Sequence, residues 1–532
     1  MAKALGCDLS SDQYEHLQTY FHCPSSGRKI YLIFDMVHMF KLIRNCLADF
    51  EMLIDGDGNL IEWKFFEDLL EVQENEGAHL ANKVTTQHVH FKNNKMKVKL
   101  ASQLLSESVA IAFEILKKLN IKDFPESDGT VKFIRIFNKL FDIFNSKKAN
   151  GEKFKEALTR ENFEEVKKFL MEAFTYISQL RFLAEEKAES DEDSESNEGS
   201  ETDEDNYKDE TEGSHFSESI LDSTRQAGFF GFLISIKSLI EVFENYIAVE
   251  NPVLTSLATY FFSQDHIEIF FGIIRQHGGY NRNPTCRQYQ TAYKKCLVQM
   301  ELKAVETGNC IPLEEVSILN SDSKPKTDDL DEVIADEEEV EFDFNDCHFG
   351  LDVDHMYNFK PEELTEFTKN VTAYIGGCVI KRIIETKKCP ACTVAMLANP
   401  ITDNCLLIDD RNKGGLRKPG MDVFYAACLC EQLIRNVLAD SGGRFIKSKY
   451  TTSTLATRIV KKISEDELDS LFTSLAVPYL SKQQIHEHKV HLLTTICSRY
   501  FNIKLHYICN KSIEKADSKR NYYNKLCDYK GA

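Results

Sequence analysis

The chain has 532 residues, 42% of them hydrophobic, and a formal net charge of -20 at pH 7. This length exceeds what a single hydrophobic core supports, and the hydrophobic content excludes a wholly disordered chain. The acidic balance does not exclude nucleic-acid binding, because segments 185–212 and 321–346 carry net charges of -13 and -10 and leave about +3 for the rest.

The chain shows no apolar signal segment at its first residues and no apolar run long enough to span a membrane. Its sixteen cysteines are therefore expected to be reduced thiols of a cytosolic or nuclear protein. These features predict no membrane association.

The first predicted element is a buried strand over 29–35, an apolar run that ends at Asp35. A helix is predicted to follow, with an apolar face formed by Met36, Phe40, Ile43 and Leu47. On another side of this helix lie His38, Lys41, Asn45 and Asp49. A strand followed directly by a helix is typical of an α/β layer.

Helical patterns dominate from Trp63 to about Leu183, most clearly as one helix from Ala101 to Leu119. They resume from Gly228 to about Val298. Within this stretch, Asp265 and Glu268 share a helix face beside an apolar face made of Ile267, Phe270, Phe271 and Ile274. A carboxylate held at the border of a core is a candidate metal ligand, although such an acid is often simply exposed.

The fold class expected from these patterns is mixed and mostly α. We predict six parts: a first part of an α/β core, a helical insertion, an acidic disordered linker, the rest of the insertion and core, a second acidic linker, and a helical C-terminal domain. Their predicted bounds are, in this order, 1–55, 56–184, 185–220, 221–300, 301–350 and 351–532.

Seven motifs occur in a fixed order, at 35–45, 82–85, 95–106, 141–146, 263–268, 278–285 and 411–416. This order resembles the transposases of the P element and its THAP-domain relatives. The resemblance implies a partial RNase H-like core interrupted by a GTP-binding insertion. It also implies nuclear localisation, binding of transposon-end DNA, and assembly into a homo-oligomer.

The resemblance implies that Asp35 and Glu268 are catalytic carboxylates that bind Mg²⁺ or Mn²⁺. From the residues alone, Asp35 also fits a helix N-cap. The family's first catalytic aspartate and its zinc-containing DNA-binding module precede the segment at which this sequence starts. We therefore expect an N-terminally truncated, catalytically incomplete chain that does not cleave DNA by itself; the alternative function is a domesticated, non-enzymatic protein that binds DNA, nucleotide or a partner.

The resemblance also implies a GTP site, with GTP as an assembly cofactor. The family positions that contact the nucleotide correspond to Lys83, Lys97, Val98, Ser106, Phe141, Asp142 and Asn145, with Asp265 nearby. Lysines suit phosphates, an aromatic ring packs on a base, and Asp or Asn side chains hydrogen-bond base and ribose edges. The alternative is an ordinary helical bundle with surface lysines.

Two further patterns carry chemistry. The segment 275–283 combines Arg275, His277, two glycines, Tyr280 and Arg282, which suits nucleic-acid contacts as well as a helix C-cap. Cys389 and Cys392 have the spacing of half a zinc site, and the candidates for the other half are His486, His488 and His491. The alternatives are free thiols or, less in keeping with the surrounding sequence, a redox pair.

Overall fold

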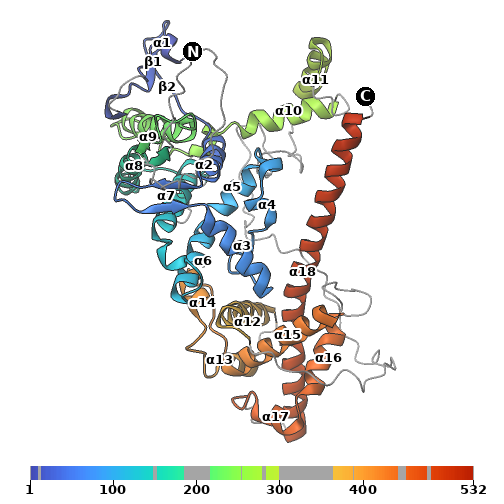
Figure 1. Cartoon of the computed structure of the whole chain (residues 1–532). Coiled ribbons are helices and arrows are strands. Elements are labelled where there is room, and N and C mark those ends of the chain that lie inside the picture. Colours follow the sequence, from blue (N-terminus) through green and yellow to red (C-terminus); the bar gives the residue numbers. More distant parts are fainter. Residues whose placement is uncertain are drawn as a thin grey trace, which may run out of the picture. The chain divides into compact units, whose positions relative to one another are not determined.

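A computed structural model describes residues 2–9, 14–147, 153–184, 216–252, 254–277, 283–298, 364–386, 389–440, 451–475 and 481–530. The contacts divide the chain into two compact units (Figure 1). Unit 1 comprises Met1–Asn75 and Leu80–Leu319, and unit 2 comprises Glu76–His79 and Asn320–Ala532. Both units are built mainly from helices, so the expected mostly helical fold class is confirmed.

Unit 1 contains two small antiparallel sheets. The first pairs β1 (Tyr20–His22) with β2 (Lys29–Tyr31). The second has the order β4-β3-β5-β6 and consists of β3 (Met52–Ile54), β4 (Leu60–Glu62), β5 (Arg181–Ala184) and β6 (Phe216–Ser219). The hairpin between β3 and β4 turns at Asp55, whose Oδ1 accepts hydrogen bonds from the backbone N–H groups of Asp57 and Asn59.

The predicted buried strand over 29–35 is wrong in length and in burial. Strand β2 ends at Tyr31, and the side chain of Ile30 is exposed. In the part of the chain that the structure describes, β2 pairs only with β1, and a two-stranded ribbon cannot bury both faces of its residues. The chain beyond β2 is held instead by α9 (Ala227–Tyr246), since the Ser238 hydroxyl donates to Leu32 O and the Phe34 N–H donates to the Ser235 hydroxyl.

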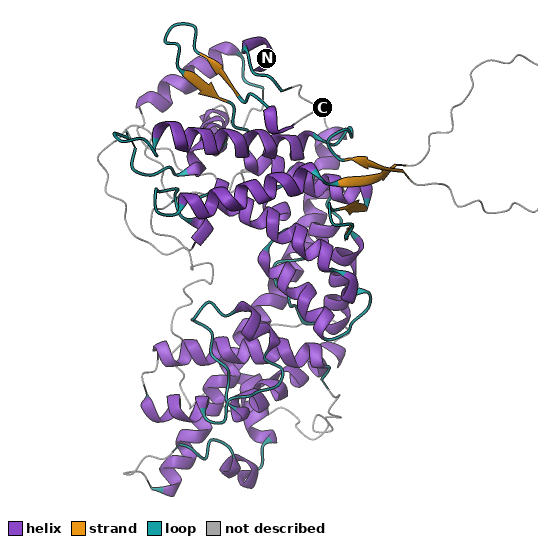
Figure 2. Cartoon of the chain, turned by 90° about the vertical axis from the view of Figure 1, so that its left-hand side faces the viewer, coloured by secondary structure: helices purple, strands orange, loops and turns teal. Residues whose placement is uncertain are grey.

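The predicted linker over 185–220 ends too late. Residues Phe216–Ser219 form β6, which pairs with β5 at the edge shown in orange in Figure 2, and the following Ile220 and Leu221 are buried. The strands that flank the acidic segment are therefore partners across the sheet. The rest of this linker, and the whole second acidic linker, lie outside the described residues.

The helices of unit 1 surround α2 (Met36–Phe50) and α9 (Ala227–Tyr246), which pack closely against each other. Gly228 allows this approach, because a Cβ there would lie 3.0 Å from Leu42 Cβ and 3.1 Å from Met39 O. The predicted apolar face of α2 is confirmed, since Met36, Phe40, Ile43 and Leu47 are all buried. The other helices are α1 (Ala2–Leu5), α3 (Lys64–Glu76), α4 (Thr86–Val89), α5 (Val98–Leu104), α6 (Glu107–Lys118), α7 (Asp128–Phe144), α8 (Phe163–Ser178), α10 (Asp265–His277) and α11 (Cys286–Val298), with 3-10 turns η1 (Tyr14–His16), η2 (Lys92–Asn94), η3 (Phe124–Glu126), η4 (Lys153–Lys155) and η5 (Thr259–Phe262).

The single helix predicted over Ala101–Leu119 is in fact two helices. Helix α5 ends at Leu104, and Ser106 takes the extended conformation of an N-cap before α6. Serine is a preferred residue at this position, so the local sequence favours the break. The Ser106 hydroxyl donates to Gln103 O at 2.8 Å, which ties the end of α5 to the start of α6.

Unit 2 is helical throughout its described residues. Its helices are α12 (Glu366–Thr386), α13 (Pro390–Leu397), α14 (Leu406–Arg411), α15 (Met421–Asp440), α16 (Thr452–Lys462), α17 (Glu465–Ser470) and α18 (Lys482–Lys530). The largest core cluster joins α12, α13, α15, α16 and α18 through buried aliphatic and aromatic side chains such as Ile380, Leu433, Leu455 and Phe501. Glycine is required at position 377 of α12, because a Cβ there would lie 2.3 Å from Arg417 O.

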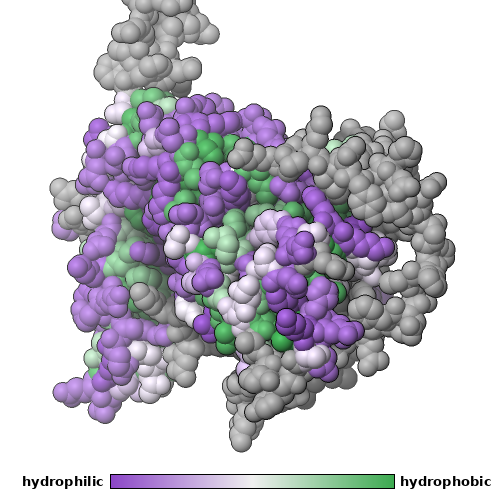
Figure 3. Space-filling model, turned by 90° about the horizontal axis from the view of Figure 1, so that it is seen from below, coloured by the Kyte–Doolittle hydropathy of each residue, from purple (hydrophilic) through white to green (hydrophobic). Residues whose placement is uncertain are grey.

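No described helix has the length and apolar character needed to cross a membrane. On the face shown in Figure 3, hydrophobic side chains occur in small groups among hydrophilic ones.

Candidate functional site

Asp35 lies at the N-terminus of α2, where both of its carboxylate oxygens accept hydrogen bonds. Oδ1 accepts from the Val37 N–H at 3.0 Å, which makes Asp35 the N-cap of the helix. Oδ2 accepts from the Gln264 N–H at 3.2 Å, immediately before α10. The cap and the long-range contact therefore coexist: the same carboxylate starts α2 and holds the start of α10 beside it.

Glu268 lies one turn into α10 and reaches the same place through His38. The His38 Nε2 is 3.1 Å from Glu268 Oε1 and 3.9 Å from Asp35 Oδ2. Both His38 and Glu268 are about one-third exposed, whereas the carboxylate of Asp35 is buried. The carboxylates of Asp35 and Glu268 thus converge on one imidazole at the edge of the core.

Two more charged groups complete what we call the acid cluster, defined as Asp35, His38, Lys41, Asp265 and Glu268. Burial raises the pKa of Asp265 to about 6, and the negative charges of Asp35 and Glu268 add to this effect. Burial lowers the pKa of Lys41, and the nearby Glu268 and Asp35 partly oppose that shift. The cluster therefore has three carboxyl groups and one buried ammonium.

The buried face of α10 differs from the prediction. Ile269, Ile273 and Ile274 are buried, whereas Ile267 and Phe271 are exposed. The helix carries apolar residues on several sides, so its sequence does not determine which side is buried. The buried side is set by packing against Ala292 and Cys296 of α11. This rotation buries Asp265 as well, which explains its raised pKa.

The sequence singled out Asp35 and Glu268 but gave no role to His38 or Lys41. The available signal was their spacing, since residues 35, 38 and 41 are three apart and lie on one face of α2. The carboxylate oxygens of Asp35, Asp265 and Glu268 are the donors that Mg²⁺ and Mn²⁺ prefer, and His38 and Lys41 offset only part of their negative charge. The residues present therefore fit a hard divalent cation.

The residues of the expected nucleotide site fall into two groups. The side chains of Lys83 and Lys97 are exposed, and Lys97 precedes α5 as its N-cap residue. Val98 is buried, so only its backbone is available to a ligand. Asp265 lies in the acid cluster.

The second group lies where α6 meets α7. The Glu107 N–H, next to Ser106, donates to Asn138 Oδ1 at 3.3 Å, and the Asn138 amide donates to Asp142 at 3.5 Å. Asn145 is the C-cap of α7. Phe141 packs on Phe40 of α2, with ring centroids 5.0 Å apart, so part of its ring is already covered.

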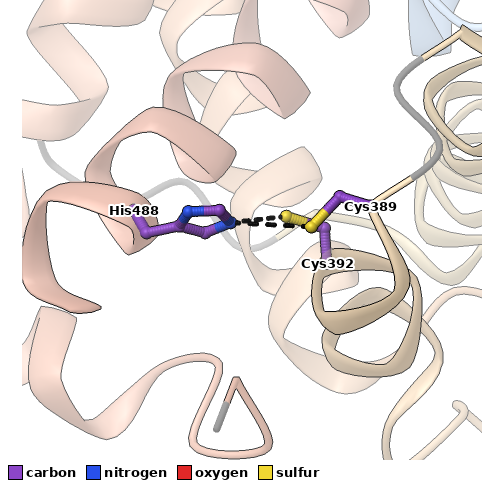
Figure 4. A group of neighbouring side chains, drawn as sticks. All are labelled: Cys389, Cys392 and His488. Carbon is purple, nitrogen blue, oxygen red and sulfur yellow. Dashed lines mark hydrogen bonds between the residues drawn. The ribbon is translucent and has the colours of Figure 1, made fainter. Parts of the chain in front are cut away.

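A third set of side chains lies in unit 2 and is shown in Figure 4. The His488 Nε2 is 2.9 Å from Cys392 Sγ and 4.0 Å from Cys389 Sγ. We call these three residues the thiol cluster. His486 instead contacts Asp469 at 3.5 Å, and the exposed His491 is not part of the cluster. A backbone hydrogen bond from Cys392 lowers the pKa of the Cys389 thiol.

The segment predicted to contact nucleic acid is described only in part. Arg275 is exposed and His277 half-buried in the last turn of α10. The glycine-rich residues 278–282 lie outside the described residues.

Comparisons with protein families match three stretches of the chain. Residues 37–157 match the TNP-like GTP-binding insertion domain, and residues 260–294 match the TNP-like RNase H C-terminal domain. Residues 363–510 match the C-terminal domain of DNA transposase THAP9. The human DNA transposase THAP9 is 26% identical over 449 residues, which cover 82% of this chain and 44% of that protein.

The chain is homologous to the P element and THAP9 transposases. The Drosophila melanogaster P element transposase is 25% identical over 407 residues, covering 76% of this chain and 46% of that protein. The chain thus spans less than half the length of these two homologues. Among solved structures, the Drosophila P element transposase strand transfer complex matches with a TM-score of 0.43 and 22% identity, covering 56% of each chain.

Most of the candidate site residues lie within the three matched stretches. The expected nucleotide residues other than Asp265 lie within the GTP-binding match, and Asp265 and Glu268 lie within the RNase H match. Asp35 lies two residues before the first match. The thiol cluster lies within the THAP9 C-terminal match.

Proposed function

We propose that the chain is a P element-type transposase protein in which the acid cluster holds a divalent metal ion and the 37–157 segment binds GTP. The observation that carries this proposal is that Asp35 lies beside α10. Its carboxylate accepts a hydrogen bond from the Gln264 N–H, and His38 links it to Glu268. The local sequence does not require this meeting, because the two carboxylates come from parts of the chain that are more than two hundred residues apart.

In the proposed metal site, Asp35 and Glu268 are the ligands and Mg²⁺ or Mn²⁺ is the ion. When bound, such an ion polarises phosphate oxygens and activates an attacking hydroxyl group. The protein's own contribution is positional. The Val37 and Gln264 N–H groups fix the Asp35 carboxylate, and the core contacts of Ile269 and Ile273 fix the helix that carries Glu268.

His38 and Lys41 are proposed to balance the cluster when no metal is bound. Buried like charges repel strongly in a low dielectric, and an imidazole between two carboxylates relieves part of that repulsion. Asp265 is proposed to support the two ligands from the protein interior. It is the least exposed carboxylate of the cluster, at 4% against 6% for Asp35.

For GTP, we propose that Lys83 and Lys97 meet the phosphates and that Asp142 and Asn145 hydrogen-bond the nucleoside. The exposure of both lysines and the match to a GTP-binding insertion domain support this assignment. Val98 takes part through its backbone, because its side chain is in the core.

We further propose that the protein binds DNA and acts in the nucleus. Helices α10 and α11 expose the basic residues Arg275, Arg287, Lys294 and Lys295, and Tyr293 is exposed beside them. Basic and aromatic side chains together suit phosphate and base contacts. Assembly into a homo-oligomer remains a prediction from the resemblance.

One observation favours a second function, that of a non-enzymatic nucleotide- and DNA-binding protein. His38 already lies between the two carboxylates and Lys41 is buried beside them, so the chain's own basic groups partly fill the role of a metal ion. Under this alternative, GTP binds but Mn²⁺ does not.

The GTP proposal is tested by calorimetric titration of the protein with GTP, alongside its thermal midpoint. We expect GTP to bind and to raise the midpoint, because a ligand that prefers the folded state stabilises it by about 2.7 kcal/mol at a hundredfold excess over Kd. The double variant Lys83→Ala/Asp142→Ala should lose both effects. Lys99→Ala, an exposed lysine on α5 outside the set, is the matched control and should keep both.

An unchanged affinity in the double variant would remove the assigned GTP site. Equal loss in the Lys99→Ala control would show that general positive charge, and no specific pocket, attracts the nucleotide.

A further inference from the structure

We propose that Cys389, Cys392 and His488 bind a Zn²⁺ ion that fastens α13 to α18. One ligand atom from each residue lies within 4.8 Å of the other two, and all three side chains point toward one another (Figure 4). Two thiols and an imidazole are the donors that Zn²⁺ prefers, and the Cys-x-x-Cys spacing is that of half a zinc site.

The distances suit a bound ion after only a small adjustment. With Zn–S bonds of about 2.3 Å and a Zn–N bond of about 2.0–2.1 Å, tetrahedral geometry places sulfur and nitrogen about 3.6 Å apart. The two observed sulfur–nitrogen distances, 2.9 Å and 4.0 Å, lie on either side of this value. Each observed distance differs from this value by less than about 1 Å, so small side-chain movements would bring the three donors to bonding distance of one ion.

The protein positions both halves of the site. Cys389 is the N-cap residue of α13, and Pro390 opens the helix at N1, which places Cys392 in the first turn. On α18, the Lys489 ammonium donates to Asp469 O at 2.8 Å, so the helix is anchored one residue after His488. His486 contacts Asp469 on the same side, which leaves His488 as the imidazole that faces α13.

The ion would join elements that are far apart in sequence. Helix α18 is the longest helix among the described residues, and its packing on α15 and α16 builds much of the unit 2 core. Three protein ligands leave one tetrahedral position for water or a further side chain. We assign the site a structural role because it joins α13 to α18, and such a role calls for a fourth protein ligand at the open position. Its soft donors distinguish it from the acid cluster, whose carboxylate donors are hard oxygens.

Zinc content and cobalt substitution test the proposal on the full chain. Purified protein should contain one Zn²⁺ at these residues, and after exchange with Co²⁺ it should show the sulfur-to-cobalt charge-transfer absorption that carboxylate sites cannot give. Cys389→Ser removes one soft ligand yet keeps the start of α13, because serine is a preferred N-cap residue. This variant and His488→Ala should each lose the metal and the absorption.

Three controls separate this site from others. His486→Ala, on the same helix, and Cys286→Ser, an exposed cysteine of unit 1, should retain zinc. Asp35→Asn should also retain it, so failure of the acid-cluster proposal leaves this one unaffected. A metal-free protein that takes up neither Zn²⁺ nor Co²⁺ under reducing conditions would overturn the proposal, as would a native Cys389–Cys392 disulfide or zinc that persists in both ligand variants.

Discussion

Two buried carboxylates, Glu431 in unit 2 and Asp265 in unit 1, have pKa values that are shifted in opposite directions. Burial by itself raises the pKa of both groups. Around Glu431, the Lys504 ammonium at 3.0 Å, the Tyr500 hydroxyl at 2.7 Å and Arg435 at 3.3 Å outweigh burial and lower its pKa. Around Asp265, Asp35 and Glu268 add negative charge, and its pKa is about 6.

The difference separates a charge that is paired within the protein from one that lies among like charges. Glu431 is satisfied within the protein and ties α15 to α18. Asp265 lies beside Asp35 and Glu268, whose negative charges add to the effect of burial, and a carboxyl group perturbed in this way is a candidate for a functional site. Perturbed carboxylates with opposite shifts therefore point to different roles within one chain.

The largest expected effect is at the satisfied carboxylate. Lys504→Met should destabilise unit 2 by about 3–5 kcal/mol, because it leaves the charge of Glu431 buried without its nearest cation. Differential scanning calorimetry measures this loss. Lys369→Met, which breaks an ion pair with the exposed Glu366, is the matched control and should cost under about 1 kcal/mol. Similar results for both variants would show that Glu431 does not depend on its partner.

An intermediate effect of opposite sign is expected at the acid cluster. The folded-state pKa of Asp265, about 6, lies above the ordinary aspartate value of 3.8, so the folded protein binds this proton more tightly than the unfolded chain. Stability therefore falls as pH rises from 3.8 to 6, and the cost is fully present at pH 7.5.

Asp265→Asn should accordingly stabilise the metal-free protein at pH 7.5 by about 1–3 kcal/mol, and the gain should vanish below pH 4. Thermal unfolding in the presence of a chelator, at several pH values, measures it. A variant that is less stable than the wild type at pH 7.5 would contradict the assigned repulsion.

The smallest expected effect is at the bridging imidazole. His38→Ala should destabilise the metal-free protein by about 0.5–1 kcal/mol, since His38 is about one-third exposed and its ion pairs are partly screened. The same unfolding measurement applies. Because His38 relieves repulsion between Asp35 and Glu268, the loss should shrink in a Glu268→Gln background, and an undiminished loss would assign His38 a packing role instead.

The sequence predicted those features that depend on local spacing. The apolar face of α2, the N-cap at Asp35 and the mostly helical fold follow from periodicity and capping preferences. The family relationship, confirmed by the comparisons, came from motif order. The GTP residues, the catalytic roles of Asp35 and Glu268, and the domain bounds other than the end of the first acidic linker remain predictions.

The features that the sequence did not predict are set by long-range packing. The pairing of β5 with β6 depends on a partner beyond the acidic segment, and the buried side of α10 depends on α11. Residues 29–34 have a strand-like composition, yet a strand is buried only where neighbouring layers cover it. The place of His38 and Lys41 in the acid cluster depends on the packing of α10 beside α2, which local spacing does not predict.

The most direct test of the acid cluster is a titration with Mn²⁺ followed by electron paramagnetic resonance, which counts free and bound ion. The wild-type chain should bind Mn²⁺, and Asp35→Asn and Glu268→Gln should each weaken binding at least about tenfold, the range seen when metal-supporting groups are lost. Cys389→Ser should leave binding unchanged. Equal Mn²⁺ affinity in all four proteins would contradict a metal site at Asp35 and Glu268.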